Sequence, residues 1–225
     1  MSESWREFLY PLGFLSSLIF ASRFILQWIG SERMQKSIVT KNFWRLSLAG
    51  NLFLLLHSVA QVQFHVGLVQ AANAVISWRN LDLMRERGPR FSLKTAVIFI
   101  LAALLTFFFV FVRFSANSEW FRVPSSPWQI SSPEPVSFFW HILGCVGLAL
   151  FNSRFWFQWW NAEKRQTSYL GPEFWWMSIF GGLFSLAYFF RIGDIVNVIG
   201  PAIGLVPYIR NLMLIYQTPS SAKNL

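Results

Sequence analysis

The sequence is poor in charged residues. Only 13% of its 225 residues are Asp, Glu, Lys or Arg, whereas 54% are hydrophobic and 19% are aromatic. A soluble domain carries about 25% charged residues, so this chain has too little polar surface to be wetted by water. The apolar residues also come in long blocks. The sequence therefore predicts an integral membrane protein.

Cysteine and the common catalytic motifs are also scarce. The single cysteine, Cys145, excludes an internal disulfide and lies in an apolar run, where we expect it to be buried. His57, His65 and His141 are scattered, without the spacing or the clustered carboxylates of a metal site. No P-loop, G-x-S-x-G or G-x-G-x-x-G sequence occurs. We therefore expect no catalytic residue, no metal and no cofactor in this chain.

Seven apolar blocks are long enough to cross a bilayer, which takes about 20 residues. The predicted spans are Phe8–Ile29, Phe43–Gln61, His65–Leu83, Leu93–Phe114, Ser137–Trp160, Phe174–Arg191 and Gly193–Tyr216. The start, MSESWREFLYPLG, has charges of both signs and no cleavage pattern, so the first block is predicted to be a retained span. The predicted fold class is an all-α, polytopic membrane protein.

The two halves of the chain match each other at a shift of 131 residues without a gap. The matched segments are SRFILQW (22–28) with SRFWFQW (153–159), the E..Q.S pattern at 32–37 with the same pattern at 163–168, and RNL (79–81) with RNL (210–212). Because polar residues match in register, shared hydrophobicity does not explain the similarity. The sequence predicts an internal duplication.

Three spans per copy is an odd number, and the extra span between the copies restores the direction of the chain. The prediction is therefore seven helices in a 3+1+3 arrangement of parallel repeats. We expect the first three-helix repeat at 8–84, a linker helix with an outer loop at 85–136, the second repeat at 137–216, and a cytoplasmic tail at 217–225.

Charge predicts the sidedness of the spans. Alternation through seven spans puts thirteen of the nineteen Lys and Arg residues on one face and four on the other, with Arg23 and Arg154 inside spans. The positive-inside rule assigns the richer face to the cytoplasm. We therefore expect the N-terminus outside and the C-terminus in the cytoplasm, and anionic membrane lipids rather than nucleic acid as partners.

The best candidates for ligand binding are Arg23 and Gln27, with their repeat mates Arg154 and Gln158. Arg and Gln at i and i+4 share a helix face, and a charge inside a span usually faces protein or water. A guanidinium matches phosphate in a bidentate fork, so one hypothesis is an anionic lipid or phosphate site. The alternative is that each Arg snorkels or pairs locally with the Glu at position 32 or 163.

Two asparagines, Asn73 and Asn197, lie within predicted spans and complete the candidate list. An amide there can bind a polyol ligand, or bond to another helix for structural reasons alone. The Phe-Trp pairs that begin two spans, at 43–44 and 174–175, are predicted to be anchors at the membrane interface.

The repeated SRFxxQW, the E..Q.S that follows it, the Phe-Trp start of the next span and the terminal RNL resemble the lipid A biosynthesis N-terminal domain. Both copies match, over about Leu9 to Tyr216. The chain is especially similar to the membrane region that precedes the glycosyltransferase in chlamydial-type lipid-A-disaccharide synthases. In those enzymes the catalytic domain joins a UDP-diacylglucosamine donor to a diacylglucosamine 1-phosphate acceptor.

The resemblance implies a module of lipopolysaccharide biosynthesis in the bacterial inner membrane. Such a module would bind or present phosphorylated acyl-glucosamine lipids at the cytoplasmic face, to a glycosyltransferase partner. The 3+1+3 layout is also similar to SWEET and PQ-loop transporters, which implies a sugar transporter or a flippase for lipid-linked sugars as the alternative. Gln27 and Gln158 fall at the Gln of the Pro-Gln motif, but Leu26 and Phe157 replace its proline.

Overall fold

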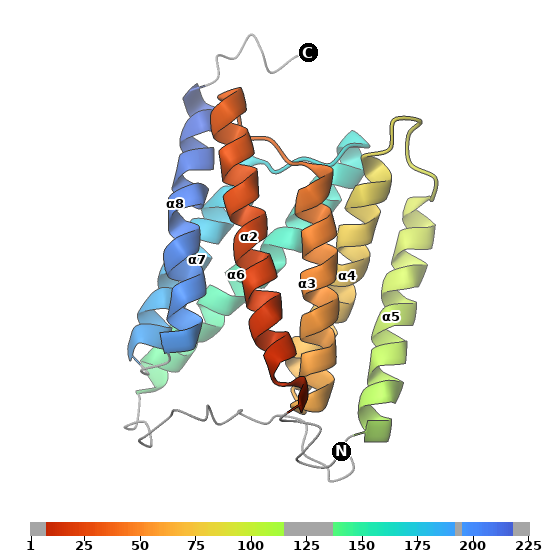
Figure 1. Cartoon of the computed structure of the whole chain (residues 1–225), viewed down its shortest axis with the longest axis vertical. Helices are drawn as coiled ribbons and strands as arrows, with labels where there is room; N and C mark the ends of the chain where they lie inside the picture. The colour runs from red at the N-terminus through yellow and green to blue at the C-terminus, as the bar shows by residue number, and fades with distance from the viewer. Residues whose placement is uncertain (1–7, 115–136, 192–194, 218–225) are drawn as a thin grey trace. The chain divides into compact units, whose positions relative to one another are not determined.

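The computed structural model describes residues 8–114, 137–191 and 195–217, and within these ranges the chain forms seven α-helices and no strands (Figure 1). The helices are α2 (Pro11–Met34), α3 (Lys41–Ala60), α4 (Phe64–Leu83), α5 (Leu93–Phe114), α6 (Phe138–Arg165), α7 (Pro172–Arg191) and α8 (Ile195–Gln217). The predicted all-α class is confirmed. The predicted outer loop from 115 onward, and residues 218–225 of the predicted tail, lie outside the described residues.

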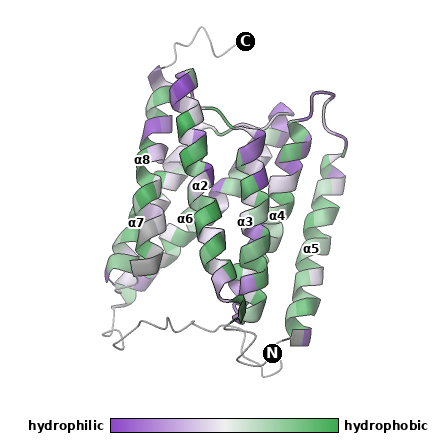
Figure 2. Cartoon of the chain, viewed as in Figure 1, coloured by the Kyte–Doolittle hydropathy of each residue, from purple (hydrophilic) through white to green (hydrophobic). Residues whose placement is uncertain are grey.

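Four of these helices, α2, α3, α5 and α6, are long and apolar enough to cross a membrane. On α5 a stripe of large apolar side chains at helical spacing is exposed, formed by Leu101, Leu105, Phe109 and Val112. Figure 2 shows this helix as mostly hydrophobic and its connection to α4 as hydrophilic. An apolar surface of this kind is stable in lipid rather than in water. The architecture is that of a helical membrane protein.

The described residues form two compact units. The first comprises residues 8–23, 41–114 and 165–168, and within it α4 packs against both α3 and α5. Val62, Ala71, Phe107 and Phe111 form a buried cluster that fixes α5 in this unit. The second unit comprises residues 24–40, 137–164, 169–191 and 195–217, and within it α7 packs against α8. Each unit therefore includes a short segment from the other copy of the sequence repeat.

A pair of rings recurs in both units with its two residue types exchanged. In the first unit, Tyr10 and His57 pack edge to face with 5.6 Å between ring centroids. At the matching positions of the second unit, His141 and Tyr188 pack edge to face at 5.9 Å. A Cβ at Gly144 would come within 2.7 Å of Tyr188, so this glycine is needed for the close approach. The ring contact has been kept while each residue type changed.

Two expectations about individual residues are wrong. The Phe-Trp pairs Phe43–Trp44 and Phe174–Trp175 are not interfacial anchors, because both tryptophans are 0% exposed and both phenylalanines 2%. Within each pair the rings meet at right angles, at 5.0 and 5.1 Å. They belong to the cores of their units. Cys145, which we expected to be buried, is exposed.

Candidate functional site

Arg23 is buried in the first unit. It lies on α2, is 5% exposed, and donates through Nη1 to Ser47 Oγ at 2.8 Å. The guanidinium carbon is 4.5 Å from the Phe20 ring centroid and 5.4 Å from that of Phe43. Ser47 in turn donates to the Phe43 carbonyl at 2.7 Å. The Arg side chain is thus held by a hydroxyl and by ring faces, rather than snorkelling.

Arg154 makes the same contacts in the second unit. It is 1% exposed and donates to Ser178 Oγ at 2.8 Å. Its guanidinium lies 3.6 Å from the Phe151 ring centroid and 5.2 Å from that of Phe174. Further rings within 5.4 Å complete an aromatic cage, from Phe24, Phe155 and Tyr208. The repeat therefore extends from the sequence to the contacts of its buried charge.

Within the described residues, Arg154 has no acidic partner, and its Nε has no hydrogen-bond partner. The aromatic faces compensate part of the charge, at about 0.5–2 kcal/mol for each favourable contact. A buried cation normally has an anion beside it. The geometry is compatible with an anionic ligand only if the cage opens, because the side chain is almost completely covered.

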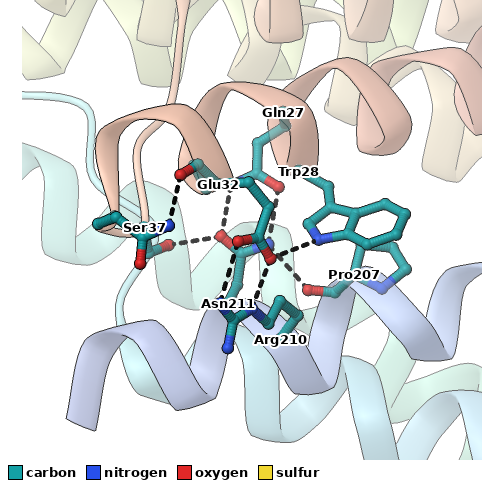
Figure 3. Close-up of polar contacts among 9 residues, drawn as sticks. Gln27, Trp28, Glu32, Ser37, Pro207, Arg210 and Asn211 are labelled. Atoms are coloured by element: carbon teal, nitrogen blue, oxygen red, sulfur yellow. Dashed lines mark hydrogen bonds and ion pairs between the residues drawn. The ribbon is translucent and has the colours of Figure 1, made fainter. Parts of the chain in front are cut away.

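Gln27 is part of an amide network in the second unit, shown in Figure 3. Its Nε2 lies 2.7 Å from Asn211 Oδ1 and 2.8 Å from the Ile38 carbonyl, and Asn211 Nδ2 donates back to Gln27 Oε1 at 3.0 Å. Ser37, on the loop after α2, also donates to Asn211 Oδ1 at 3.0 Å. The network ties α2 and its following loop to α8, which makes Gln27 a structural residue in this arrangement.

An ion pair lies beside this network. Arg210 donates from Nε and Nη2 to the two carboxylate oxygens of Glu32, the second contact at 3.0 Å. Trp28 Nε1 also donates to Glu32, at 3.1 Å. The alternative of a local pair between Arg23 and Glu32 is therefore not observed, since a cation of the other copy pairs with Glu32 instead. Such two-point Arg–carboxylate contacts fix orientation as well as charge.

The first unit contains the matching loop contact. Ser168, on the loop after α6, donates to Asn80 Oδ1 at 2.7 Å and accepts a hydrogen bond from Trp44 Nε1 at 2.7 Å. Asn80 and Asn211 are the asparagines of the two RNL segments. The serine that each copy carries after its first helix therefore binds the RNL asparagine of the other copy. We call these two contacts the loop latches.

The loop latches differ in one hydrogen bond. The indole of Trp44 donates to Ser168 in the first unit. Trp175, the repeat mate of Trp44, is fully buried, and its Nε1 has no hydrogen-bond partner among the described residues. A buried donor without a partner costs about 1–3 kcal/mol. The latch of the second unit is therefore the weaker one.

Two of the remaining candidate residues, Gln158 and Asn73, have described side chains. Gln158 is buried and donates to the Tyr169 carbonyl at 3.2 Å. Asn73 is buried on α4, and its Oδ1 has no hydrogen-bond partner within the described residues. Close in sequence, Ser77 donates to the Asn73 carbonyl and accepts from Asn51 at 3.2 Å. The side chain of Asn197 lies outside the described part of the chain.

A clamp that the sequence reading missed organises the loop between α4 and α5. Arg79 pairs with Asp82 at 2.7 Å and donates to the Phe91 carbonyl at 2.7 Å. Asp82 accepts the backbone N–H groups of Arg90 at 3.0 Å and of Phe91 at 3.2 Å. Arg79 and Asp82 are both buried. The only signal in the sequence was the acid two positions after the first RNL asparagine, where the second copy has Met213.

This loop carries a dense set of exposed cations. Arg85, Arg87 and Arg90 are exposed on the loop, and Lys94 on the first turn of α5. Glu86 is the one acid among them. The cations contrast with the buried Arg23 and Arg154, because an anion can reach them without any rearrangement. We call these four residues the basic loop. Within the described residues, no three His, Cys, Asp or Glu side chains gather as a metal site.

The comparisons with known proteins agree with the repeat. A family model described as Lipid A Biosynthesis N-terminal domain matches residues 12–82 and 143–213. These two matches are offset by the 131 residues that separate the copies in the sequence. The predicted duplication is therefore confirmed as two copies of one domain.

The chain is also similar to curated lipid-A-disaccharide synthases. It is 38% identical over 212 residues to that of Chlamydia felis, 36% over 215 residues to that of Chlamydia pneumoniae, and 33% over 207 residues to that of Chlamydia trachomatis. These alignments cover 93%, 95% and 92% of this chain, and 33%, 34% and 34% of the relatives. The chain thus spans about one third of the length of these relatives. No solved structure matches it.

Proposed function

The chain belongs to the Lipid A Biosynthesis N-terminal domain family, and from this premise we propose that it is a membrane module that holds anionic, acylated glucosamine lipids for a lipid-A-disaccharide synthase. The relatives bear the name of that enzyme over chains about three times as long. The module would present the lipid, and a glycosyltransferase, fused or separate, would form the disaccharide. No group within the described residues of this chain needs to act in the chemistry.

The proposed setting is the bacterial inner membrane, with α5 as the linker between the two parallel three-helix repeats in the chain. In this arrangement the N-terminus is outside and the C-terminus in the cytoplasm, as the positive-inside rule favours. The basic loop then faces the cytoplasm, where nucleotide sugars are available. A glycosyltransferase on this side would meet both its donor and the lipid held by the module.

The basic loop is the single observation that carries the proposal. Four exposed cations lie within ten residues, and the buried Arg79–Asp82 clamp fixes the backbone between them. A cation near an anionic membrane surface contributes about 1 kcal/mol to binding. A clamped loop also loses less conformational freedom on binding than a flexible one. This combination suits a phosphorylated lipid headgroup.

The proposal is tested with the purified protein in nanodiscs and diacylglucosamine 1-phosphate as the probe lipid. Replacing Arg85, Arg87 and Arg90 together by Gln is expected to weaken retention of the lipid by at least tenfold, measured by native mass spectrometry. The control replaces Arg33 and Lys36, which are exposed on the other unit, by Gln. Equal retention by the loop variant and the wild type would refute the proposed headgroup site.

The partner half of the proposal has an independent check. A reading frame beside this gene should encode a lipid A glycosyltransferase, if the catalytic part is not fused to the chain. Co-expression of that enzyme with this protein should raise disaccharide output over the enzyme with an unrelated seven-span anchor. Equal output from the two anchors would reduce the module to passive attachment.

A second candidate function is transport of a sugar or a lipid-linked sugar. Asn73 favours it, because its buried Oδ1 has no partner in the described residues and lies on the same helix as Ser77, which Asn51 contacts. Polar groups within a span often mark a substrate path. Flux of labelled glucosamine or of a fluorescent glucosamine lipid into proteoliposomes, lost in Asn73→Ala, would support transport. Absence of flux for both probes would remove it.

A further inference from the structure

The second unit has an open groove between α7 and α8. Its volume is about 510 Å³, within the range of small-ligand sites, and it is lined by Trp176, Ile179, Ile209, Leu212, Met213, Tyr216 and Gln217. Ile179 and Leu212 are buried and form its floor, whereas Ile209 and Met213 are exposed on its wall. No charged side chain is among the lining residues. The groove suits an uncharged, apolar occupant.

One end of the groove is polar and the rest is not. Trp176 Nε1 donates to Tyr216 Oη at 3.3 Å, and Gln217, the last residue of α8, lies beside this pair. Trp and Tyr are enriched where the hydrocarbon of a membrane meets the headgroups. The groove therefore runs from headgroup level, at the end of α8, into the hydrocarbon region.

The groove is continuous with an exposed apolar stripe on α8. The stripe consists of Ile203, Val206, Ile209, Met213 and Tyr216, at spacings of three and four residues. In a membrane protein such a stripe contacts lipid. A groove in a lipid-facing surface is filled by acyl chains rather than by water, because water there would lack hydrogen-bond partners.

We propose that this groove binds one acyl chain of the glucosamine lipid that the module presents, with the ester end at Trp176 and Tyr216. The inference rests on the proposed function for the identity of the lipid. It adds that the module contacts the lipid through an acyl chain, for which the uncharged lining of the groove is suited.

The test fills the groove and compares it with an equal change outside it. Ile209→Trp places an indole in the groove, whereas Val206→Trp adds an indole to the same α8 stripe at a residue that does not line the groove. Both positions are about half exposed, at 48% and 55%. Each protein is incubated in nanodiscs with diacylglucosamine 1-phosphate or with phosphatidylglycerol, and the retained lipid is measured by native mass spectrometry.

We expect Ile209→Trp to retain at least tenfold less glucosamine lipid than the wild type. Val206→Trp should retain as much of this lipid as the wild type. Phosphatidylglycerol retention should be the same in all three proteins. Equal glucosamine-lipid retention by the two variants would overturn the groove while leaving the headgroup site standing. Loss of phosphatidylglycerol in Ile209→Trp alone would assign the groove to bulk phospholipid. Loss of a dimer mass in Ile209→Trp would assign the groove to a second copy of the chain. Both outcomes also overturn the inference.

Discussion

Arg154 donates to Ser178 at 2.8 Å, and 131 residues earlier Arg23 donates to Ser47 at the same distance. Each guanidinium is buried against phenylalanine rings. The repeated pair shows that the two copies handle an expensive buried charge in the same way, through a hydroxyl acceptor and aromatic faces.

Removing the serine hydroxyl that accepts from the buried guanidinium should destabilise the protein. Ser178→Ala is expected to lower the free energy of unfolding by about 1–3 kcal/mol, because a buried charged donor loses its acceptor. Denaturant titration of the protein in detergent micelles measures the change. Ser153→Ala removes a half-buried serine whose hydroxyl bonds only within its own helix, and it should change stability by less than about 0.5 kcal/mol. A Ser178→Ala protein as stable as this control would contradict the role of the hydroxyl.

The loop latches should differ in strength. Ser168→Ala removes two hydrogen bonds, the one from Trp44 Nε1 and the one to Asn80 Oδ1, whereas Ser37→Ala removes one bond to Asn211, which still binds Gln27. We expect Ser168→Ala to destabilise the protein by about 1–2 kcal/mol more than Ser37→Ala. Chemical unfolding of the two variants side by side provides the comparison. A larger loss of stability in Ser37→Ala than in Ser168→Ala would mean that the unpartnered indole N–H of Trp175 does not weaken the loop latch of the second unit.

The clamp on the basic loop gives a test in which charge and geometry oppose each other. Asp82→Asn raises the net positive charge by one but loses the ion pair with Arg79 and weakens the hold on the loop backbone. We expect weaker binding of diacylglucosamine 1-phosphate, by about tenfold. Glu86→Gln makes the same change in charge on an exposed residue, and there binding should stay equal or strengthen. If both variants bind more tightly, the loop acts through its charge alone.

The exchanged ring pair predicts that two substitutions compensate each other. Tyr10→His and His57→Tyr each place two like rings in contact and should each cost about 1 kcal/mol of stability. Together they reproduce the pair seen at 141 and 188, so the double variant should recover at least half of the summed loss. A double-mutant cycle by thermal unfolding in detergent measures this coupling, and additive losses would argue against it.

Much of the fold could be predicted from hydropathy, because a span of about 20 apolar residues has few alternatives in a bilayer. The predicted linker helix agrees with α5 at both ends, Leu93 and Phe114. The buried pairing of Arg23 could not be predicted, since its acceptor Ser47 lies 24 residues away on the next helix. A helix face predicted from spacing does not specify which neighbouring helix covers it.

The same limit explains why the partner of Glu32 could not be predicted and why the prediction for the Phe-Trp pairs was wrong. Glu32 binds Arg210, 178 residues away, and no local pattern contains that information. The Phe-Trp pairs have the composition of interfacial anchors, but Trp44 is buried and bonded to a loop of the other copy. Sequence reasoning gives the depth of such a residue along the helix, and only the packing decides whether it meets lipid or protein.

The crossed loop latches make each copy dependent on the other. In a copy expressed alone, the RNL asparagine would lack the serine that donates to it, and the serine of its own loop would lack its acceptor. Such a copy should therefore be stable only when it pairs with a second molecule. Gene duplication followed by fusion would then have turned a partnership between separate chains into an internal one. The two copies could then diverge in charge, as the basic loop of one and the uncharged α7–α8 groove of the other show, while each still required the loop of the other.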